Sequence, residues 1–180
     1  AARQDPASFR RRHLAAQPRH LAVLDLVLEK SGWATPLPDR HRGLAIQEAF
    51  GTIVAQVAEV SIAAHGSIRV HRVICAVDCG LAVNPDIVRQ QMEGAILFGL
   101  SAALYGEISI EDGAVQQSNF HDYRVLRMAD SPAIDVHIVS GGTEPSGAGE
   151  PGVPPIALAV ANAVYAATGQ RLCTLPLRLS

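Results

Sequence analysis

The sequence predicts an α+β fold, with antiparallel or mixed strands and packed helices, from the spacing of its apolar residues. Apolar residues recur at helical spacing near the N-terminus, alternate with a period of two over residues 43–77, and return to helical spacing in residues 87–105 and 154–168. Consecutive strands without intervening helices are typical of α+β folds rather than of doubly wound sheets. At 180 residues, the chain is expected to form one domain or one lobe of something larger.

Residues 1–35 are expected to form a helical hairpin. Asp5 followed by Pro6 predicts the start of a first helix, because Asp favours the N-cap and Pro the first helical position. A second helix is predicted after Pro18, and its leucines recur at helical spacing up to Gly32. Residues 1–4 have helical character but no cap of their own. We therefore expect a fragment that begins inside or just after a helix of a longer polypeptide.

Residues 36–180 are expected to form an α+β lobe. Its predicted elements are, in order, three antiparallel strands at 43–47, 52–62 and 68–77, a helix from Asn84-Pro85-Asp86 to Tyr105, a hairpin at 108–110 and 114–116, a strand at 134–139, a helix from Pro154 or Pro155 to Thr168, and an extended piece at 172–177. Asp112-Gly113 predicts the hairpin turn because both residues tolerate positive φ, and Gly169 predicts the final helix cap.

The composition argues against several classes of function. The chain has 15 basic and 17 acidic residues and no long block of like charge beyond residues 10–12, so a nucleic-acid-binding surface is not indicated. No apolar run approaches the roughly 18 residues that a membrane-spanning helix needs, and residues 1–20 lack the apolar core of a signal peptide. We therefore expect a soluble chain with no membrane span and no nucleic-acid partner.

The three cysteines and the overall apolar character point to burial. Cys75, Cys79 and Cys173 are too few and too unevenly spaced for a disulfide framework or a zinc site, so ordinary buried thiols are expected. Hydrophobic residues make up 48% of the chain and charged residues only 18%, which indicates more apolar surface than a free chain of this size readily hides. We therefore expect a partner surface.

A loop rich in glycine and proline spans residues 140–155 and carries Glu150. Five glycines and four prolines in these 16 residues are incompatible with a helix or a strand. Because Glu150 lies between Gly149 and Pro151, its carboxylate can be fixed in a cavity near a helix N-terminus, where it could bind a ligand or accept a proton. On these residues alone, a solvated carboxylate that caps the next helix is favoured over a catalytic one.

Other polar groups have simpler interpretations. Gln91 offers two donors and an acceptor, but on the residues alone it is expected to satisfy a neighbouring backbone group, and Gly94 to allow close helix packing. Asp78, Asn84 and Asp86 could be imagined as a metal site, yet their places at a strand end and a helix start favour capping.

Two segments together resemble a known enzyme family. Gly149-Glu150-Pro151-Gly152-Val153-Pro154-Pro155 and Gln91-Met92-Glu93-Gly94-Ala95 resemble the large subunits of molybdenum hydroxylases, the xanthine dehydrogenase and aldehyde oxidase superfamily. The similarity covers nearly the whole chain. Within the superfamily, residues 19–21 and 97–100 look most like bacterial isoquinoline 1-oxidoreductase β subunits. The resemblance implies that the chain is the C-terminal lobe of a molybdenum-cofactor-binding subunit.

The resemblance also implies roles for individual residues. Glu150 matches the general base that deprotonates a molybdenum-bound hydroxyl, and a carboxylate suits this role because it becomes neutral beside an electropositive metal. Gln91 matches the glutamine that hydrogen-bonds the pterin. No protein ligand to the metal is implied, since the pterin itself holds molybdenum. His121-Asp122 could suggest acid–base work, but Phe120–Leu126 resembles a strand that leads toward the substrate channel, so supporting packing is expected there.

For the whole protein, the resemblance implies oxidation of an N-heterocycle or an aldehyde with water as the oxygen source. The implied cofactor is a molybdenum-pterin in its cytosine dinucleotide form, and the implied partners are a small subunit with [2Fe-2S] clusters and the remainder of the large subunit. The fragment alone is expected to be inactive, and a bacterial cytoplasm and periplasm both remain open. The alternative is a non-catalytic assembly or interaction module derived from this family.

Overall fold

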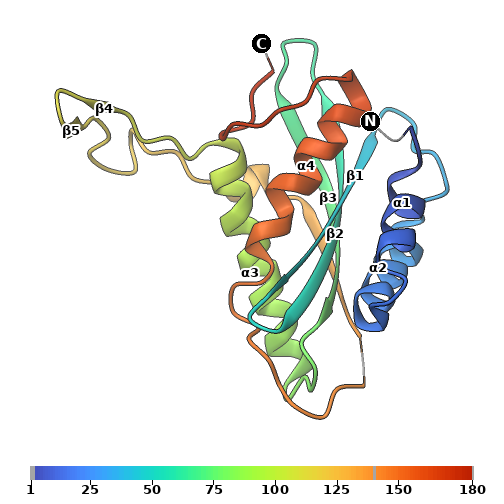
Figure 1. Cartoon of the computed structure of the whole chain (residues 1–180). Helices are drawn as coiled ribbons and strands as arrows, with labels where there is room; N and C mark the ends of the chain where they lie inside the picture. Colours follow the sequence, from blue (N-terminus) through green and yellow to red (C-terminus); the bar gives the residue numbers. More distant parts are fainter. Residues whose placement is uncertain (1–2, 140, 180) are drawn as a thin grey trace.

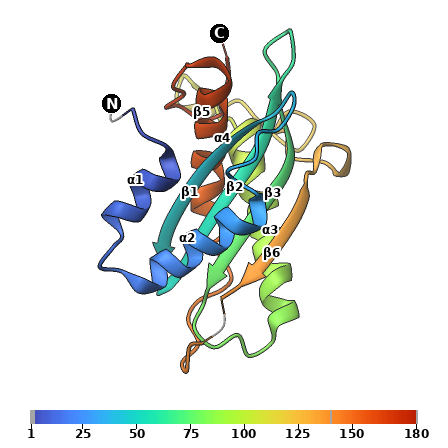
Figure 2. The same ribbon diagram turned by 90° about the vertical axis from the view of Figure 1, so that its right-hand side faces the viewer.

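A four-stranded sheet lies between two layers of helices (Figure 1). This computed structural model describes residues 3–139 and 141–179, so Ser140 of the predicted glycine-rich loop and residues 1, 2 and 180 lie outside the description. In sheet order, the strands are β1 (His41–Ala49), β2 (Thr52–Ile62), β3 (Ile68–Asp78) and β6 (Ala133–Ile138). On one side of the sheet lie α1 (Pro6–His13) and α2 (Pro18–Ser31), and on the other lie α3 (Pro85–Leu104) and α4 (Val153–Thr168) (Figure 2).

Helix α1 begins, and helix α2 begins and ends, at the residues that the sequence indicates. The Asp5 carboxylate accepts a hydrogen bond from the Ser8 backbone N–H at 2.8 Å, which caps α1. Helix α2 ends at Gly32, whose φ of 58° is the left-handed conformation that favours glycine. Its apolar face packs on the sheet through four buried residues, Val23, Leu24, Val27 and Leu28.

The sheet is mixed rather than purely antiparallel. Strands β1, β2 and β3 form the predicted antiparallel meander. Strand β6 pairs with β3 in parallel, after the chain has crossed over through α3. The first nine residues of β2 are all buried, because helices cover both faces of this central strand. The α+β class is therefore confirmed.

One predicted strand does not form. Residues 120–126 have no strand conformation, and Phe120 is 70% exposed. They follow a small hairpin, β4 (Ile110–Glu111) and β5 (Ala114–Val115), which projects from the body of the molecule (Figure 1). The Asp122 carboxylate accepts from the backbone N–H groups of Ser118 and Asn119, and this local turn takes the place of strand pairing. The short helix η1 (Met128–Asp130) that follows is not predicted either.

Helix α4 lies directly on β1. Its buried face consists of Pro155, Ile156, Ala159, Val160, Ala163 and Val164. At Gly43 in β1, an added Cβ would collide with the backbone of Ala159 and Ala163, so only glycine lets the helix come this close. Gly169, with φ 75°, ends α4 as predicted. Among the described residues, no helix combines the length and apolar character that a membrane crossing requires.

Substituting Gly43 tests this contact. Gly43→Ala is expected to lower the free energy of unfolding by about 1–3 kcal/mol, because the new methyl group must push α4 away from β1. Thermal or urea unfolding of the purified protein measures the change. Gly94→Ala is the matched control: a Cβ there meets no atom within 4 Å, and alanine in mid-helix is expected to stabilise by about 0.5–1 kcal/mol. Equal effects of the two substitutions would contradict the close contact.

Candidate functional site

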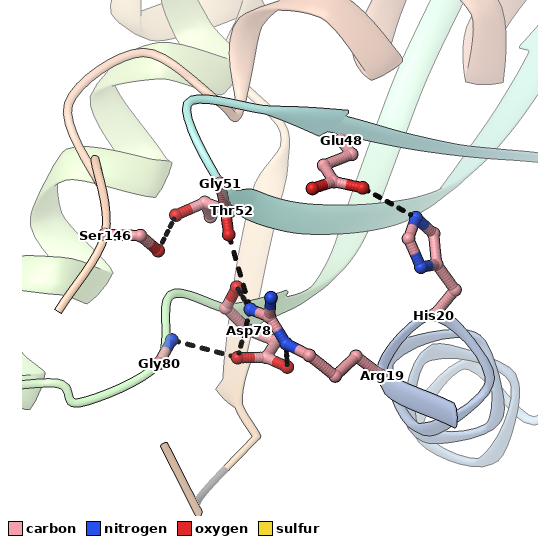
Figure 3. A network of polar contacts seen from close by, with 8 residues as sticks. All are labelled: Arg19, His20, Glu48, Gly51, Thr52, Asp78, Gly80 and Ser146. Atoms are coloured by element: carbon pink, nitrogen blue, oxygen red, sulfur yellow. Dashed lines mark hydrogen bonds and ion pairs between the residues drawn. The ribbon is translucent and has the colours of Figure 1, made fainter. Parts of the chain in front are cut away.

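The first half of the Glu150 loop is tied to the end of the sheet. The backbone N–H of Leu81 donates to the Glu144 carbonyl at 3.0 Å, and the N–H of Ser146 donates to the Cys79 carbonyl at 2.9 Å. The hydroxyls of Ser146 and Thr52 lie 2.6 Å apart (Figure 3). These contacts give the loop a fixed course across the end of β3 and the turn between β1 and β2.

Asp78 organises the surface on which this loop lies. Its carboxylate, 9% exposed, receives Arg19 Nε at 2.9 Å and the Gly80 backbone N–H at 2.9 Å. The Arg19 guanidinium also reaches the Gly51 carbonyl at 3.3 Å, so the end of β3, α2 and the β1–β2 turn meet at one ion pair (Figure 3). The hydrogen bond from Arg19 lowers the pKa of the Asp78 carboxyl. Asp78 is therefore structural.

The neighbouring polar residues, Asn84 and Asp86, bond to residues close to them in the sequence. Asn84 Oδ1 accepts from the backbone N–H groups of Asp86 and Ile87 at 3.1 Å each, which confirms its predicted role as the cap of α3. The Asp86 carboxylate pairs with Arg89 at 2.7 Å. Within residues 3–139 and 141–179, no group of three or more His, Cys, Asp or Glu side chains could hold a metal ion.

The second half of the loop is fixed against β2 and α3. The Gly152 carbonyl accepts a hydrogen bond from Gln56 Nε2 at 2.8 Å, and the Val153 N–H donates to the Glu150 carbonyl at 2.9 Å. A Cβ on Gly152 would lie 3.0 Å from Ala95 Cβ and 3.4 Å from the Met92 carbonyl, so the loop backbone lies close to α3. The backbone on the C-terminal side of Glu150 is thus held by two separate elements.

Glu150 itself is exposed in this chain. The predicted enclosure of its carboxylate is therefore not provided by the described residues. A cavity of about 300 Å³ at the start of the loop is lined by Gly141, Gly142, the end of β6, residues 80–82 and the first turns of α3, but neither Glu150 nor Gln91 lines it. Of the simpler alternative, the solvated carboxylate is confirmed, because Glu150 is exposed, but its capping role is wrong, because the cap of α4 is Gly152 and α4 has no side-chain cap hydrogen bond.

Gln91 lies on α3, the helix that approaches the Glu150 loop at Gly152. Its side chain is exposed on α3, and in the part of the chain described its amide has no hydrogen-bond partner, so it does not satisfy a neighbouring backbone group. The next residue, Met92, is fully buried and lies against Gly152. A carboxylate and an unpaired amide on a fixed backbone are groups that fit one edge of a pterin site, since such a ligand presents both donors and acceptors.

Sequence reasoning missed Gln56. This residue is 0% exposed in the central strand β2 and lies opposite Cys75 of β3. Burial raises the pKa of the Cys75 thiol to about 12, so the thiol is neutral. An amide within the apolar run 52–58 is the signal that could have identified it. Cys75 and Cys79 are buried as predicted, whereas Cys173 is exposed, which corrects that expectation: it lies in the C-terminal segment, outside the core.

The ion pair at Asp78 supports a stability prediction. Asp78→Asn is expected to lower the free energy of unfolding at neutral pH by about 1–3 kcal/mol, because it removes hydrogen bonds to a charged group. The folded-state pKa of Asp78 lies below its ordinary value of 3.8, so this stabilisation is complete above pH 3.8 and is lost as the pH falls through the folded-state pKa. The difference in the free energy of unfolding between the parent and Asp78→Asn should therefore become smaller in acid.

Asp86→Asn is the matched control for this measurement by thermal unfolding. Its ion pair with Arg89 is exposed, with 84% of the Asp86 side chain accessible, and exposed pairs contribute about 0.2–1 kcal/mol. If Asp78→Asn were no more destabilising than Asp86→Asn, the structural role of Asp78 would be rejected.

Comparison with known proteins places the chain in a family. Residues 15–132 match the molybdopterin cofactor-binding domain. The chain is 41% identical over 179 residues to the isoquinoline 1-oxidoreductase β subunit of Brevundimonas diminuta, covering 97% of this chain and 23% of that protein. It is 31% identical over 148 residues to the aldehyde oxidoreductase molybdenum-binding subunit of Escherichia coli strain K12, covering 72% of this chain and 20% of that protein.

A solved structure gives the same result. The crystal structure of quinoline 2-oxidoreductase from Pseudomonas putida 86 matches with a TM-score of 0.62 and 26% identity, over 69% of this chain and 17% of that chain. The chain thus spans a quarter or less of the length of these relatives. Sequence, fold and family match agree, and the chain belongs to the molybdopterin cofactor-binding domain family, within the xanthine dehydrogenase superfamily.

Proposed function

We propose that the protein containing this chain is a molybdenum-dependent oxidoreductase that oxidises an N-heterocycle or an aldehyde with water as the oxygen source. Glu150 is its general base, and Gln91 contacts the pterin. The observation that carries the proposal is the placement of an exposed carboxylate, Glu150, on a backbone that is fixed beside α3, the helix that also carries the exposed Gln91. When bound, the molybdenum cofactor supplies the redox centre that accepts electrons from the substrate.

The contribution of Glu150 is to accept a proton at its carboxylate. Gly149 adds no side chain beside it, and Pro151 fixes its own φ, so the approach to the carboxylate is open on a rigid backbone. The carboxylate is exposed in this chain, and we infer that other parts of the protein cover it. Partial removal of water strengthens a carboxylate as a base, and ionised carboxylate is the form needed at the start of the step.

The contribution of Gln91 is to bind and orient the pterin. Its amide can donate two hydrogen bonds and accept others, whereas a charged side chain would serve only one kind of partner. Helix α3 supplies a rigid base for it, because Met92 and Ile96 on the buried face are 0% exposed. We propose the cytosine dinucleotide form of the cofactor, on the resemblance to isoquinoline 1-oxidoreductase β subunits.

The partners we propose are the remainder of the large subunit and a small subunit with [2Fe-2S] clusters. Large apolar side chains are exposed on the loop side and on the two helices α3 and α4, with Phe50, which contacts the loop at Gly147, 66%, Phe98 71% and Leu158 54% accessible, and such side chains favour a covering partner. The relatives are named as oxidoreductase subunits, which favours an enzyme over a non-catalytic module. A small-molecule substrate is proposed on the same basis.

Replacing the carboxylate tests the role of Glu150. In the assembled enzyme, Glu150→Gln is expected to lower kcat/KM by about 10²–10⁴-fold, because an amide of the same shape cannot accept the proton. Molybdenum and pterin content should stay at the parent level. Glu144→Gln, another exposed position in the same loop, is the control and should leave turnover unchanged. Parent-like rates in Glu150→Gln would exclude the base role.

Cofactor retention tests the role of Gln91. Gln91→Leu removes the hydrogen bonds to the pterin, each worth about 0.5–1.5 kcal/mol, so the affinity for the cofactor should fall roughly 2- to 10-fold per bond lost. Molybdenum per protein, measured after gel filtration in cofactor-free buffer, should fall accordingly. Gln90→Leu makes the same change at the neighbouring exposed position of α3 and should retain the cofactor. Equal retention by the two variants would reject the proposed contact.

A further inference from the structure

We propose that Gln56 is a positioning residue that sets where Glu150 lies by holding the carbonyl of Gly152. The inference rests on the proposed role of Glu150 as base. Gln56 is 0% exposed in β2, and its Nε2 donates to the Gly152 carbonyl at 2.8 Å. Gly152 is two residues from Glu150 and forms the cap of α4.

The burial of Gln56 makes this hydrogen bond unusual. Successive residues of a strand point to opposite faces, so Val54 and Ala58 share its face, and both are 0% exposed in the core beneath α4. An apolar side chain would fill this position without desolvating an amide. A buried amide at this position therefore implies a polar partner, and Gln56 donates a hydrogen bond to the Gly152 carbonyl.

The orientation of the amide follows from its partner. A backbone carbonyl can only accept, so the NH₂ group of Gln56 must face Gly152. The other end of the amide, Oε1, is buried and has no hydrogen-bond partner among the described residues. Burying an acceptor without a partner costs free energy, and in Gln56 only the hydrogen bond donated by Nε2 offsets this cost. The Gln56 side chain also contacts the Cys75 thiol and lowers the pKa of that thiol slightly against the larger effect of burial, so the loop carbonyl is its backbone partner.

The hydrogen bond to Gly152 also restricts the position of Glu150, because the backbone between these two residues is short and rigid. Pro151 is the only residue between Gly152 and Glu150, and the Val153 N–H bonded to the Glu150 carbonyl closes the turn. Ala95 and Met92 of α3 also lie close to Gly152, since a Cβ added there would be 3.0 Å from Ala95 Cβ. The Gln56 hydrogen bond and the close approach to α3 therefore both limit where the Gly152 backbone can lie.

Loss of the donor gives the first test, made in the assembled enzyme. Gln56→Met keeps the length of the side chain but cannot donate to Gly152. We expect kcat to fall about 10- to 100-fold with little change in KM or molybdenum content, because the base is displaced while binding is retained. Amide hydrogen exchange in residues 148–155 should become faster, and this readout does not depend on turnover.

Val57→Ala is the control for loss of packing. Val57 is 0% exposed on the opposite face of β2, in the core beneath α2, and it does not touch the loop. It should lower Tm and leave both kcat and the exchange of residues 148–155 at parent values. A merely structural role of Gln56 would give the same pattern in Gln56→Met, a lower Tm without a change in the loop, and would overturn the proposal.

In a second variant, the hydrogen bond to Gly152 depends on pH. In Gln56→Glu, the neutral carboxyl group can donate to the Gly152 carbonyl, whereas the ionised form repels it. Because burial favours the neutral form, the kcat of this variant relative to the parent should be highest at low pH and fall as the pH rises. The ratio for Gln56→Met should not change with pH. A ratio for Gln56→Glu that is as low as that of Gln56→Met at every pH would contradict the proposal.

The two hypotheses fail in different ways. If Glu150→Gln retained activity, the base role would fail, while faster loop exchange in Gln56→Met would still support the control of loop position by Gln56. If Glu150→Gln were inactive but Gln56→Met kept parent kcat and parent exchange, the base role would stand and the positioning role of Gln56 would be overturned.

Discussion

The N-terminal end of α4 is held between a buried amide and a neighbouring helix, and the geometry of the whole site depends on this. Gln56 in β2 bonds the Gly152 carbonyl at 2.8 Å, and Ala95 and Met92 of α3 lie close to the same residue. The close approach of α4 to β1 at Gly43 keeps the remainder of the helix in line. The loop, which lies outside the named helices and strands, thereby acquires a fixed end.

The other end of the loop depends on a different set of bonds. Arg19 and the Gly80 N–H hold the Asp78 carboxylate, and the segment that follows Asp78 bonds the loop at Glu144 and Ser146. Between these two anchored ends, the Glu150 side chain reaches outward from the surface. The carboxylate is thus exposed between two fixed stretches of backbone, in a chain that spans 23% of the length of a relative.

Local signals in the sequence were enough for most elements. Asp5, Gly32, Asn84 and Gly169 mark helix ends because caps and left-handed glycines act within a few residues. The parallel pairing of β6 with β3 was not predictable, because periodicity defines the faces of a strand but not its neighbour. The strand expected at 120–126 failed for the same reason, since no pairing partner lies beside it among the described residues.

The site was predictable in its residue types and not in its surroundings. The sequence indicates that Glu150 lies on a constrained loop. The exposure of its carboxylate depends on residues distant in the chain, so residue spacing in the sequence does not determine whether the carboxylate is enclosed. Gln56 escaped notice because its partner, Gly152, is 96 residues away. The most direct test of the account is an experimental structure of the assembled, cofactor-loaded enzyme. The Glu150 carboxylate and the Gln91 amide should face the bound cofactor, with Gln56 still bonded to Gly152; a Glu150 that points into bulk water, away from the cofactor, would contradict the account.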